Sequence, residues 1–369
     1  MGMRIAYDAK RAFANKRGLG NYSRDVIRLM QNFAPENEYV LFGIPSPLCD
    51  TSNARVVSPQ GVWRAFPALW RSYGCIHELG NVDIYHGLSG ELPFGIHRTN
   101  VKTVVTIHDT IFMRYPELYS AGYRRLFARK VQYACNHADI VIAISEQTKQ
   151  DIITYFHADE SKIRVVYQGC NNRFREPVID ENVAQIKKQY DLPAQYVLTV
   201  GAIEPRKNLR NLIEAMHTEH IEMPLVVVGA PSKYAVQMSR LAQQCNIDMQ
   251  YVHHLPFEDL PAVYKGASVF CYPSIYEGFG IPILEAMCVG TPVVTSTGSC
   301  FAETGGEAAL YADPFLPEQI GSQLSRVLSD KVLRNTMIGK GLEQAGRFTD
   351  EKVANNLISV YNTLKSEKK

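Results

Sequence analysis

Two glutamates that flank a glycine-rich loop are the residues of this sequence best suited to chemistry. Glu277 enters the loop, and Glu285 follows eight positions later on a predicted short helix. Gly278 and Gly280 allow a close backbone approach and positive φ angles, and Pro282 suits a first helical turn. Free amides of that turn favour an anion or a hydroxyl group, and each carboxylate can accept hydrogen bonds from hydroxyl groups. The loop therefore predicts a site for a polyhydroxyl ligand; the alternative is that both carboxylates only complement the helix dipole in water.

A pair of adjacent cations is the second candidate. Arg206 and Lys207 follow a predicted strand, residues 196–201, that ends in glycine. A guanidinium can hold a phosphate with two hydrogen bonds, and an ammonium acts as a point charge. Cations are poorly placed at the positive end of a helix unless an anion is bound there. We therefore expect the pair to hold a pyrophosphate; the alternative is a solvated pair at a helix start.

The first half of the chain offers a histidine and a glycine turn. A β-branched strand ends at Ile107 and delivers His108 and Asp109 to its carboxyl end, where open α/β sheets place their ligands. The alternative is a histidine whose hydrogen bonds are satisfied in the core. Gly20 lies in a turn that is expected to join the first strand to a helix beginning near Asn21 and to present backbone amides at the same edge of the sheet.

The elements that must position these residues alternate between strand and helix along the chain, which predicts an α/β protein with doubly wound sheets. A length of 369 residues favours two domains. We place the first at residues 1–175 and the second at 176–349, and we expect the last helix, about 350–366, to join the first domain. Strands are predicted at residues 4–8, 39–43, 83–87, 102–107, 138–144, 163–169, 196–201, 225–229, 249–255, 267–273 and 293–294.

Three segments resemble one enzyme family over nearly the whole chain. The segment EGFGIPILEAM at residues 277–287 is similar to the two-glutamate signature of retaining, nucleotide-sugar-dependent glycosyltransferases of family 4. The segment TIHDTIFMRYP at 106–116 resembles the mannosyltransferase-like branch of that family, and GAIEPRKN at 201–208 resembles its donor-phosphate segment. Many relatives carry an arginine directly after the first glycine of the last segment, where this chain has Ala202.

The resemblance implies the GT-B fold, in which two Rossmann-like domains face each other across a cleft and the last helix crosses back to the first domain. It implies that His108, Asp109 and Glu277 act in catalysis, with Glu277 and His108 near the transferred sugar and Glu285 at the donor ribose. The donor-binding residues that it implies are Gly20, Arg206, Lys207, Gly278, Phe279, Gly280, Ile281 and Glu285.

The resemblance also implies a reaction: transfer of a hexose with retention of configuration to a glycan or polyprenyl-linked glycan in surface polysaccharide synthesis, such as O-antigen or lipopolysaccharide. GDP-mannose is the favoured donor, and a UDP- or dTDP-sugar is the alternative. No cofactor or metal is expected, because the sequence has no Asp-x-Asp motif at a strand end. A catalytically idle sugar-nucleotide binding protein is a second alternative. An NAD-dependent or epimerising enzyme is disfavoured because a full G-x-G-x-x-G turn is absent from the sequence.

Composition limits where the protein works. The N-terminus has no signal-peptide profile and no apolar run reaches the length of a membrane span, so we expect a cytoplasmic protein.

Residues 1–175 carry 22 Lys and Arg against 15 Asp and Glu, a net charge of +7, while the remainder has a net charge of −5. The basic half favours an anionic surface. We expect peripheral contact with the inner face of the membrane rather than nucleic-acid binding, and a role in solubility alone is the alternative. Residues 63–73 mix tryptophans with arginines and suit a membrane interface, although a packed helix face with solvated arginines is the preferred reading. The eight cysteines are expected to be reduced and mostly buried.

Overall fold

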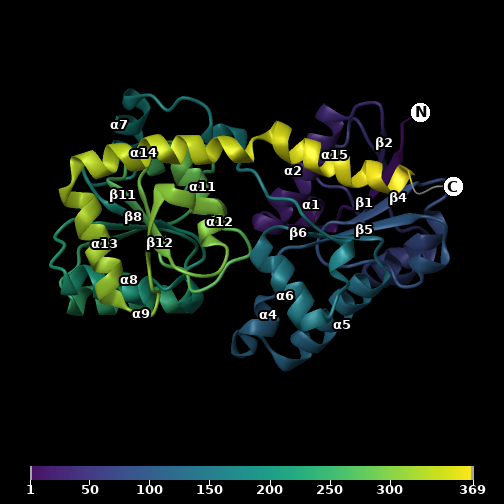
Figure 1. The fold of residues 1–369 in the computed structure, drawn as a ribbon, viewed down its shortest axis with the longest axis horizontal. Coiled ribbons are helices and arrows are strands. Elements are labelled where there is room, and N and C mark those ends of the chain that lie inside the picture. The colour runs from purple at the N-terminus through teal and green to yellow at the C-terminus, as the bar shows by residue number, and fades with distance from the viewer. Residues whose placement is uncertain (1, 367–369) are drawn as a thin grey trace. The chain divides into compact units, whose positions relative to one another are not determined.

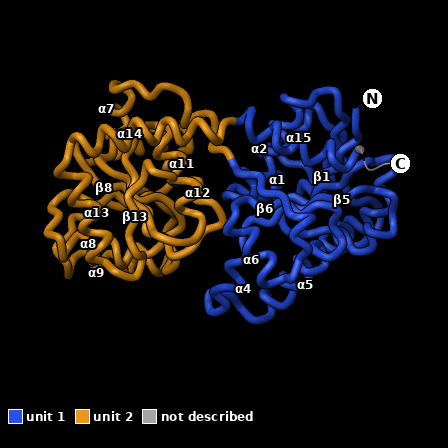
Figure 2. Tube along the Cα trace, in the orientation of Figure 1, with its two compact units in different colours: residues 1–168, 350–369 blue, residues 169–349 orange. Residues whose placement is uncertain are grey.

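The computed structural model describes residues 2–366 and divides the chain into two compact units. Unit 1 comprises residues 1–168 and 350–369, and unit 2 comprises residues 169–349 (Figure 2). The expected boundary at residue 175 lies inside unit 2. The reason is visible at Phe174, whose buried ring packs edge-on against Phe257 and Tyr264 of that unit.

Unit 1 is built on a parallel seven-stranded sheet with the order β3-β2-β1-β4-β5-β6-β7. Its strands are β1 (Arg4–Asp8), β2 (Glu38–Phe42), β3 (Arg55–Val57), β4 (Ile84–Gly87), β5 (Lys102–Ile107), β6 (Ile140–Ala143) and β7 (Ile163–Val165). Its helices are α1 (Lys10–Ala14), α2 (Gly18–Phe33), α3 (Pro67–Leu69), α4 (Ile111–Arg114), α5 (Ala121–His137), α6 (Glu146–Phe156) and α15 (Asp350–Ser366), of which all but α3 are labelled in Figure 1.

The core of unit 1 lies on both faces of its sheet, because successive residues of a strand point to opposite faces. In β1, Ile5 and Tyr7 pack on one face and Ala6 packs on the other. Helix α15 completes the first of these faces and runs beside α2 (Figure 1). The side chains that α15 buries there recur every three or four positions, as expected for an amphipathic helix: Val353, Ala354, Leu357, Val360, Tyr361 and Leu364.

Unit 2 is built on a parallel six-stranded sheet with the order β10-β9-β8-β11-β12-β13. Its strands are β8 (Val197–Val200), β9 (Leu225–Val228), β10 (Met249–Val252), β11 (Val269–Tyr272), β12 (Val293–Ser296) and β13 (Ala309–Ala312). Its helices are α7 (Asp180–Gln189), α8 (Leu209–Thr218), α9 (Lys233–Gln244), α10 (Leu260–Lys265), α11 (Ile281–Cys288), α12 (Phe301–Gly305), α13 (Pro317–Ser329) and α14 (Lys331–Ala345).

Two strands and two helix starts differ from the expectations. Strands β3 and β13 were not predicted; both are short edge strands that pair on one side only, so pairing rather than sequence pattern makes them strands. Helix α2 begins at Gly18 rather than Asn21, because the Arg17 carbonyl accepts from the amides of Gly20 and Asn21 and closes the first turn. A basic amphipathic pattern over residues 117–137 predicts a helix start at Glu117, but helix α5 begins at Ala121, where Ser120 caps the amide of Tyr123.

The aromatic segment near residue 70 is not the single helix face that we preferred. It consists of 3-10 turns, the short helix α3 and a π-helical turn, Trp70–Gly74. Trp70 is buried and donates a hydrogen bond to Glu78. Arg71 is also buried, because it pairs with Asp8 and Glu91, so the expectation of solvated arginines is wrong at this position. Among the described residues, no helix is both long and apolar enough to cross a membrane.

Candidate functional site

The site in unit 2 forms where the order of its strands reverses. Strand β8 lies between β9, which follows it in the chain, and β11, which comes much later. In open parallel sheets the chain leaves two such neighbouring strands in opposite directions, which opens a crevice at their carboxyl ends. The segment after β8 carries Arg206 and Lys207 in a 3-10 turn, and the segment after β11 carries Glu277. Strand order thus brings together side chains that lie 70 positions apart.

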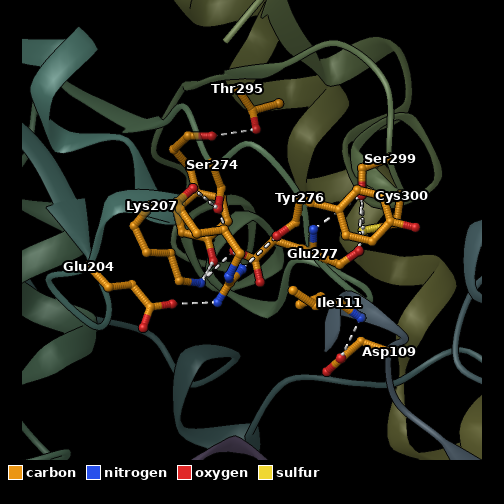
Figure 3. Close-up of polar contacts among 12 residues, drawn as sticks. Asp109, Ile111, Glu204, Lys207, Ser274, Tyr276, Glu277, Thr295, Ser299 and Cys300 are labelled. Carbon is orange, nitrogen blue, oxygen red and sulfur yellow. Dashed lines mark hydrogen bonds and ion pairs between the residues drawn. The ribbon is translucent and has the colours of Figure 1, made fainter. Parts of the chain in front are cut away.

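A buried cluster of charges occupies this edge of the sheet. The Nη1 atom of Arg206 lies 2.7 Å from Oε1 of Glu277, and the Nζ atom of Lys207 lies 2.5 Å from the same oxygen. Figure 3 shows Lys207 and Glu277 pointing toward each other, with Ser274 donating a further hydrogen bond to Glu277. Lys207 also donates to the Tyr272 hydroxyl at 2.6 Å. The three charged side chains are only 12–18% exposed, so their interactions are weakly screened by water.

The electrostatics keep Glu277 ionised. Burial alone would raise the pKa of its carboxyl, but the charges of Lys207 and Arg206 outweigh burial and lower that pKa to about 2. Arg206 also pairs with Glu204 at 2.6 Å, and Glu204 is 42% exposed. The cluster therefore holds two cations against two carboxylates, of which only Glu277 is well buried.

The alternative of a solvated Arg206–Lys207 pair is wrong, because both side chains are largely buried. We took cations at a helix start as a sign of a bound anion, yet the structure supplies an anion of its own in Glu277. Arg206 is further held by the Tyr276 carbonyl at 2.5 Å. The pair is thus fixed before any ligand binds.

The glycine loop ends in a cap for helix α11. Gly280 has a φ of 96° and is the N-cap of the helix, which begins with Ile281. Gly278 does not take the positive φ that we expected for it. Phe279 is buried, packs edge-on against Phe348, and its carbonyl accepts a hydrogen bond from Thr304. Phe279 therefore anchors the loop through its side chain.

Glu285 lies one turn into α11 and is partly buried. Its Oε2 accepts a hydrogen bond from the buried Tyr264 hydroxyl at 2.9 Å. Burial raises the pKa of this carboxyl to about 7, and the Tyr264 hydrogen bond offsets only part of the shift. Glu277 and Glu285 therefore differ in kind: one is held as a carboxylate by fixed cations, and the other titrates near neutrality.

His108 occupies the carboxyl end of β5 in unit 1, as predicted, but within a packed setting. Its Nε2 lies 2.9 Å from the Leu88 carbonyl, and because a carbonyl can only accept, Nε2 carries the proton and Nδ1 is an acceptor. Burial lowers the pKa of His108 to about 4, so the ring is neutral at pH 7. The ring of Tyr22 packs edge-on against it, with centroids 4.5 Å apart.

A chain of buried hydrogen bonds holds Tyr22 in place. Its hydroxyl lies 3.0 Å from Oγ1 of Thr106, which lies 2.8 Å from Nε2 of His86. The other nitrogen of His86 lies 2.7 Å from the hydroxyl of Tyr361, on helix α15. His86, which lies in β4, is therefore a fully buried structural residue. The last helix reaches the surroundings of His108 through this chain.

Gly20 and Asp109 have local structural roles in unit 1. Gly20 lies inside α2, and a Cβ there would come within 1.7 Å of the Asn15 carbonyl oxygen, so close packing requires glycine. This packing fixes the helix turn that carries Tyr22. Asp109 accepts a hydrogen bond from the amide of Ile111 at 3.1 Å, at the start of α4 (Figure 3).

Within unit 2, the structure thus brings Arg206, Lys207 and Glu277 together and gives Glu285 a partner of its own in Tyr264. Within unit 1, His108 is held by the Leu88 carbonyl and the Tyr22 ring. Sequence reasoning missed the partners of these residues, namely Glu204, Tyr264, Tyr272, Ser274 and Tyr22. Ser274 and Tyr272 carried a usable signal, since both lie at the carboxyl end of a predicted strand. Tyr22 and Tyr264 carried no such signal, because the site residues that they contact come from distant parts of the chain and these contacts are identified only in the folded structure. Within residues 2–366, no three His, Cys, Asp or Glu side chains are grouped so as to hold a metal ion.

Comparison with known proteins matches both halves of the chain to sequence models of related families. The model described as Glycosyltransferase Family 4 matches residues 23–173, and the model described as Glycosyl transferases group 1 matches residues 182–344. The first match lies in unit 1 except for its last residues, 169–173, and the second lies in unit 2. The resemblance seen in the sequence is therefore confirmed over both units.

Individual relatives agree with the family models. The chain is 29% identical to the O-antigen chain mannosyltransferase B of Escherichia coli, over 94% of this chain and 96% of that protein. It is 26% identical to the O-antigen chain mannosyltransferase RfbU of Salmonella typhimurium, over 75% and 73% of the two chains. A crystal structure of a glycosyltransferase from Rickettsia africae shares the fold over the full length of both chains, with a TM-score of 0.79 at 16% identity. The chain therefore belongs to glycosyltransferase family 4 and has the GT-B fold of two Rossmann-like domains.

Proposed function

We propose that this glycosyltransferase moves mannose from GDP-mannose to a growing glycan or polyprenyl-linked glycan during synthesis of a surface polysaccharide such as O-antigen. Arg206 and Lys207 hold the donor diphosphate, and Glu285 accepts hydrogen bonds from the ribose hydroxyls. Glu277 and His108 act at the transferred sugar. The relatives named O-antigen chain mannosyltransferase support the choice of mannose and of a polysaccharide acceptor.

The cluster of Arg206, Lys207 and Glu277 is the observation that carries the proposal. Two buried cations share the Glu277 carboxylate at the carboxyl edge of the sheet, which places fixed cationic groups where a leaving diphosphate needs neutralisation. The ion pairs hold both cations in place, so little reorganisation is needed when the negative charge of the leaving group develops.

A panel of GDP-, UDP- and dTDP-sugars tests the donor and the reaction together. We expect sugar release and transfer from GDP-mannose above all others, and a preference for a UDP- or dTDP-sugar would overturn the choice of mannose donor. An idle binding protein would bind a donor without releasing sugar from it, even with acceptor glycan present.

The diphosphate site is tested by substitution. Arg206→Ala and Lys207→Ala should each weaken GDP binding by roughly 1.5–3 kcal/mol, the value of a charge-assisted hydrogen bond. Arg210→Ala is the matched control, because Arg210 lies in the first turn of helix α8, is 64% exposed and pairs with Glu214 of the same helix. Calorimetry that gives the double variant and the control equal GDP affinity would overturn the assignment.

Two finer parts of the proposal concern mechanism. The fixed cations stand in for a metal ion, so transfer should continue in the presence of EDTA at an unchanged rate. The family resemblance supports retention of the anomeric configuration, and NMR of the product formed from GDP-mannose should show the α-anomer. A strict requirement for a divalent cation, or an inverted product, would each refute the corresponding part.

We also propose that unit 1 contacts the membrane surface peripherally. Four apolar side chains are more than half exposed in one short segment that also holds the exposed Arg64: Val62, Phe66, Leu69 and Tyr73. Apolar side chains beside a cation suit an interface with anionic lipid. Co-sedimentation with vesicles containing anionic lipid should fall for Phe66→Glu combined with Leu69→Glu, and it should not fall for Val332→Glu, a more exposed apolar position in unit 2.

A further inference from the structure

Two cysteines far apart in the sequence lie in direct contact in unit 2. The Sγ atoms of Cys170 and Cys288 are 3.1 Å apart, although 118 positions separate the residues. Cys170 is the second residue of unit 2 and is buried, while Cys288 ends helix α11 and is partly exposed. A disulfide needs sulfur atoms about 2.05 Å apart, so a movement of about 1 Å would suffice to form one.

The surroundings give the two sulfur atoms different roles. A hydrogen bond from the thiol of Cys170, more than any other influence, lowers the pKa of Cys288, and the charge of Arg175 acts in the same direction. The same hydrogen bond and burial raise the pKa of Cys170. Arg175 is anchored by the carbonyls of Ala345 and Phe348, and its buried Nε has no hydrogen-bond partner among the described residues. Cys288 is therefore the better nucleophile and also the more accessible sulfur.

We propose that Cys170 and Cys288 form a peroxide-reactive site that closes to an intramolecular disulfide. The Cys288 thiolate attacks hydrogen peroxide, the O–O bond breaks, and a sulfenic acid and hydroxide form. The Cys170 sulfur then attacks Sγ of Cys288, the S–O bond breaks, and water leaves with the proton of the Cys170 thiol. The two thiols lose two electrons, and the peroxide is reduced to two molecules of water.

The bond would join the start of unit 2 to the end of the helix that carries Glu285. Closing so long a loop restricts the unfolded chain, so the oxidised protein should unfold at a higher temperature than the reduced protein. Glu285 lies one turn before Cys288 in α11, so the bond would also fix the helix end next to this carboxylate. The inference does not depend on the proposed donor or acceptor.

Oxidation of the intact protein tests the site. At low hydrogen peroxide, we expect the free thiol count to fall by two and peptide mapping to recover one disulfide that links Cys170 to Cys288. Cys245 is the matched control within the same chain, because it is also partly exposed but has no cysteine partner at contact distance among the described residues. Peroxide that oxidises Cys245 while Cys288 stays reduced would overturn the proposal.

Single substitutions test the order of events. In Cys170→Ser, and in Cys170→Ala in case a buried hydroxyl disturbs folding, the sulfenic acid should persist on Cys288 and be trapped by dimedone. In Cys288→Ser, Cys170 should remain a thiol at the same peroxide concentration. Dimedone labelling of Cys170 in Cys288→Ser, or no labelling of Cys288 in either Cys170 variant when each melts as the wild type does, would show that the contact is only packing.

Discussion

At the scale of single residues, Glu285 makes donor binding depend on pH. Its pKa of about 7 leaves it partly protonated near neutrality, and only the carboxylate can accept hydrogen bonds from two ribose hydroxyls. We expect the affinity for GDP-mannose to rise as the pH increases through 7, and Glu285→Gln to remove this dependence. GDP-mannose is the suitable ligand because its diphosphate has no terminal phosphate group to titrate in this range.

Calorimetry across this pH range checks the expectation, with Glu343→Gln, at an exposed helical position, as the control that keeps the dependence. The same burial predicts an effect on stability. Because the folded pKa lies above the ordinary value of 4.5, the free energy of unfolding should fall as the pH rises from 4.5 through 7. A flat binding profile for the wild type would remove Glu285 from the ribose site.

Replacing Glu277 should have opposite effects on GDP binding and on stability. Glu277→Gln leaves Arg206 and Lys207 without their shared counter-charge, so we expect GDP to bind about tenfold more tightly, which corresponds to about 1.4 kcal/mol. The same change should lower the free energy of unfolding at pH 7 by on the order of 3 kcal/mol, because it removes one partner of a buried ion pair.

The direction in which stability changes with pH follows from the lowered pKa of Glu277. Its contribution to stability is complete above the ordinary value of 4.5 and is lost as the pH falls toward 2. Urea unfolding at several pH values should show this loss in the wild type and a smaller one in Glu277→Gln. Weaker GDP binding in the variant would mean that the carboxylate itself contacts the nucleotide.

At the scale of elements, the start of α11 depends on one backbone angle. Gly280 has a φ of 96°, which L-residues rarely adopt, and an added Cβ would lie 3.3 Å from Cδ1 of Ile283. Gly280→Ala should therefore lower the free energy of unfolding by roughly 1–3 kcal/mol. Gly339→Ala is the matched control, because Gly339 lies exposed within helix α14 with no atom within 4 Å of an added Cβ.

The control should change stability in the other direction. Alanine reduces the entropy of the unfolded chain and favours the helix, so Gly339→Ala should raise the free energy of unfolding by about 0.4–1 kcal/mol. Guanidinium titrations of both variants measure the two effects. Equal stability of Gly280→Ala and the wild type would show that the loop can relax to another conformation.

At the scale of the whole molecule, the end of the chain is part of the first unit. Removing residues 350–369 would take six buried side chains of α15 from the core of unit 1, together with the Tyr361 hydroxyl that holds His86. Unit 2 contains its own core and loses none of it. Hydrogen exchange should therefore show lost protection in residues 2–168 and retained protection in residues 169–349.

A milder variant tests the same point without truncation. Leu357 is fully buried in the unit 1 core, so Leu357→Ala should cost about 2–5 kcal/mol of that unit's stability. Exchange in unit 2 should again be unaffected. Protection in unit 1 that survives the truncation would show that α15 is only an attached helix.

The sequence by itself determined the fold class and most of the elements. Buried parallel strands read as short apolar runs, and the run at residues 102–107 was found with its ends, as was the last helix at 350–366. Local sequence patterns determine these elements. A β-branched run favours a strand, and apolar residues spaced three to four positions apart favour a helix. Edge strands β3 and β13 lack a β-branched run as long as that at residues 102–107, so they were not predicted.

The sequence also singled out Arg206, Lys207, Glu277, Glu285 and His108, since residue type and position at a strand end are local properties. Only the tertiary structure decided how they interact. The strand order β9-β8-β11 brings the two cations to Glu277, and packing against Tyr264 and Tyr22 sets the environments of Glu285 and His108. Ionisation depends on burial and on charges within a few ångströms, and such neighbours come from segments 70 positions away that no local pattern connects.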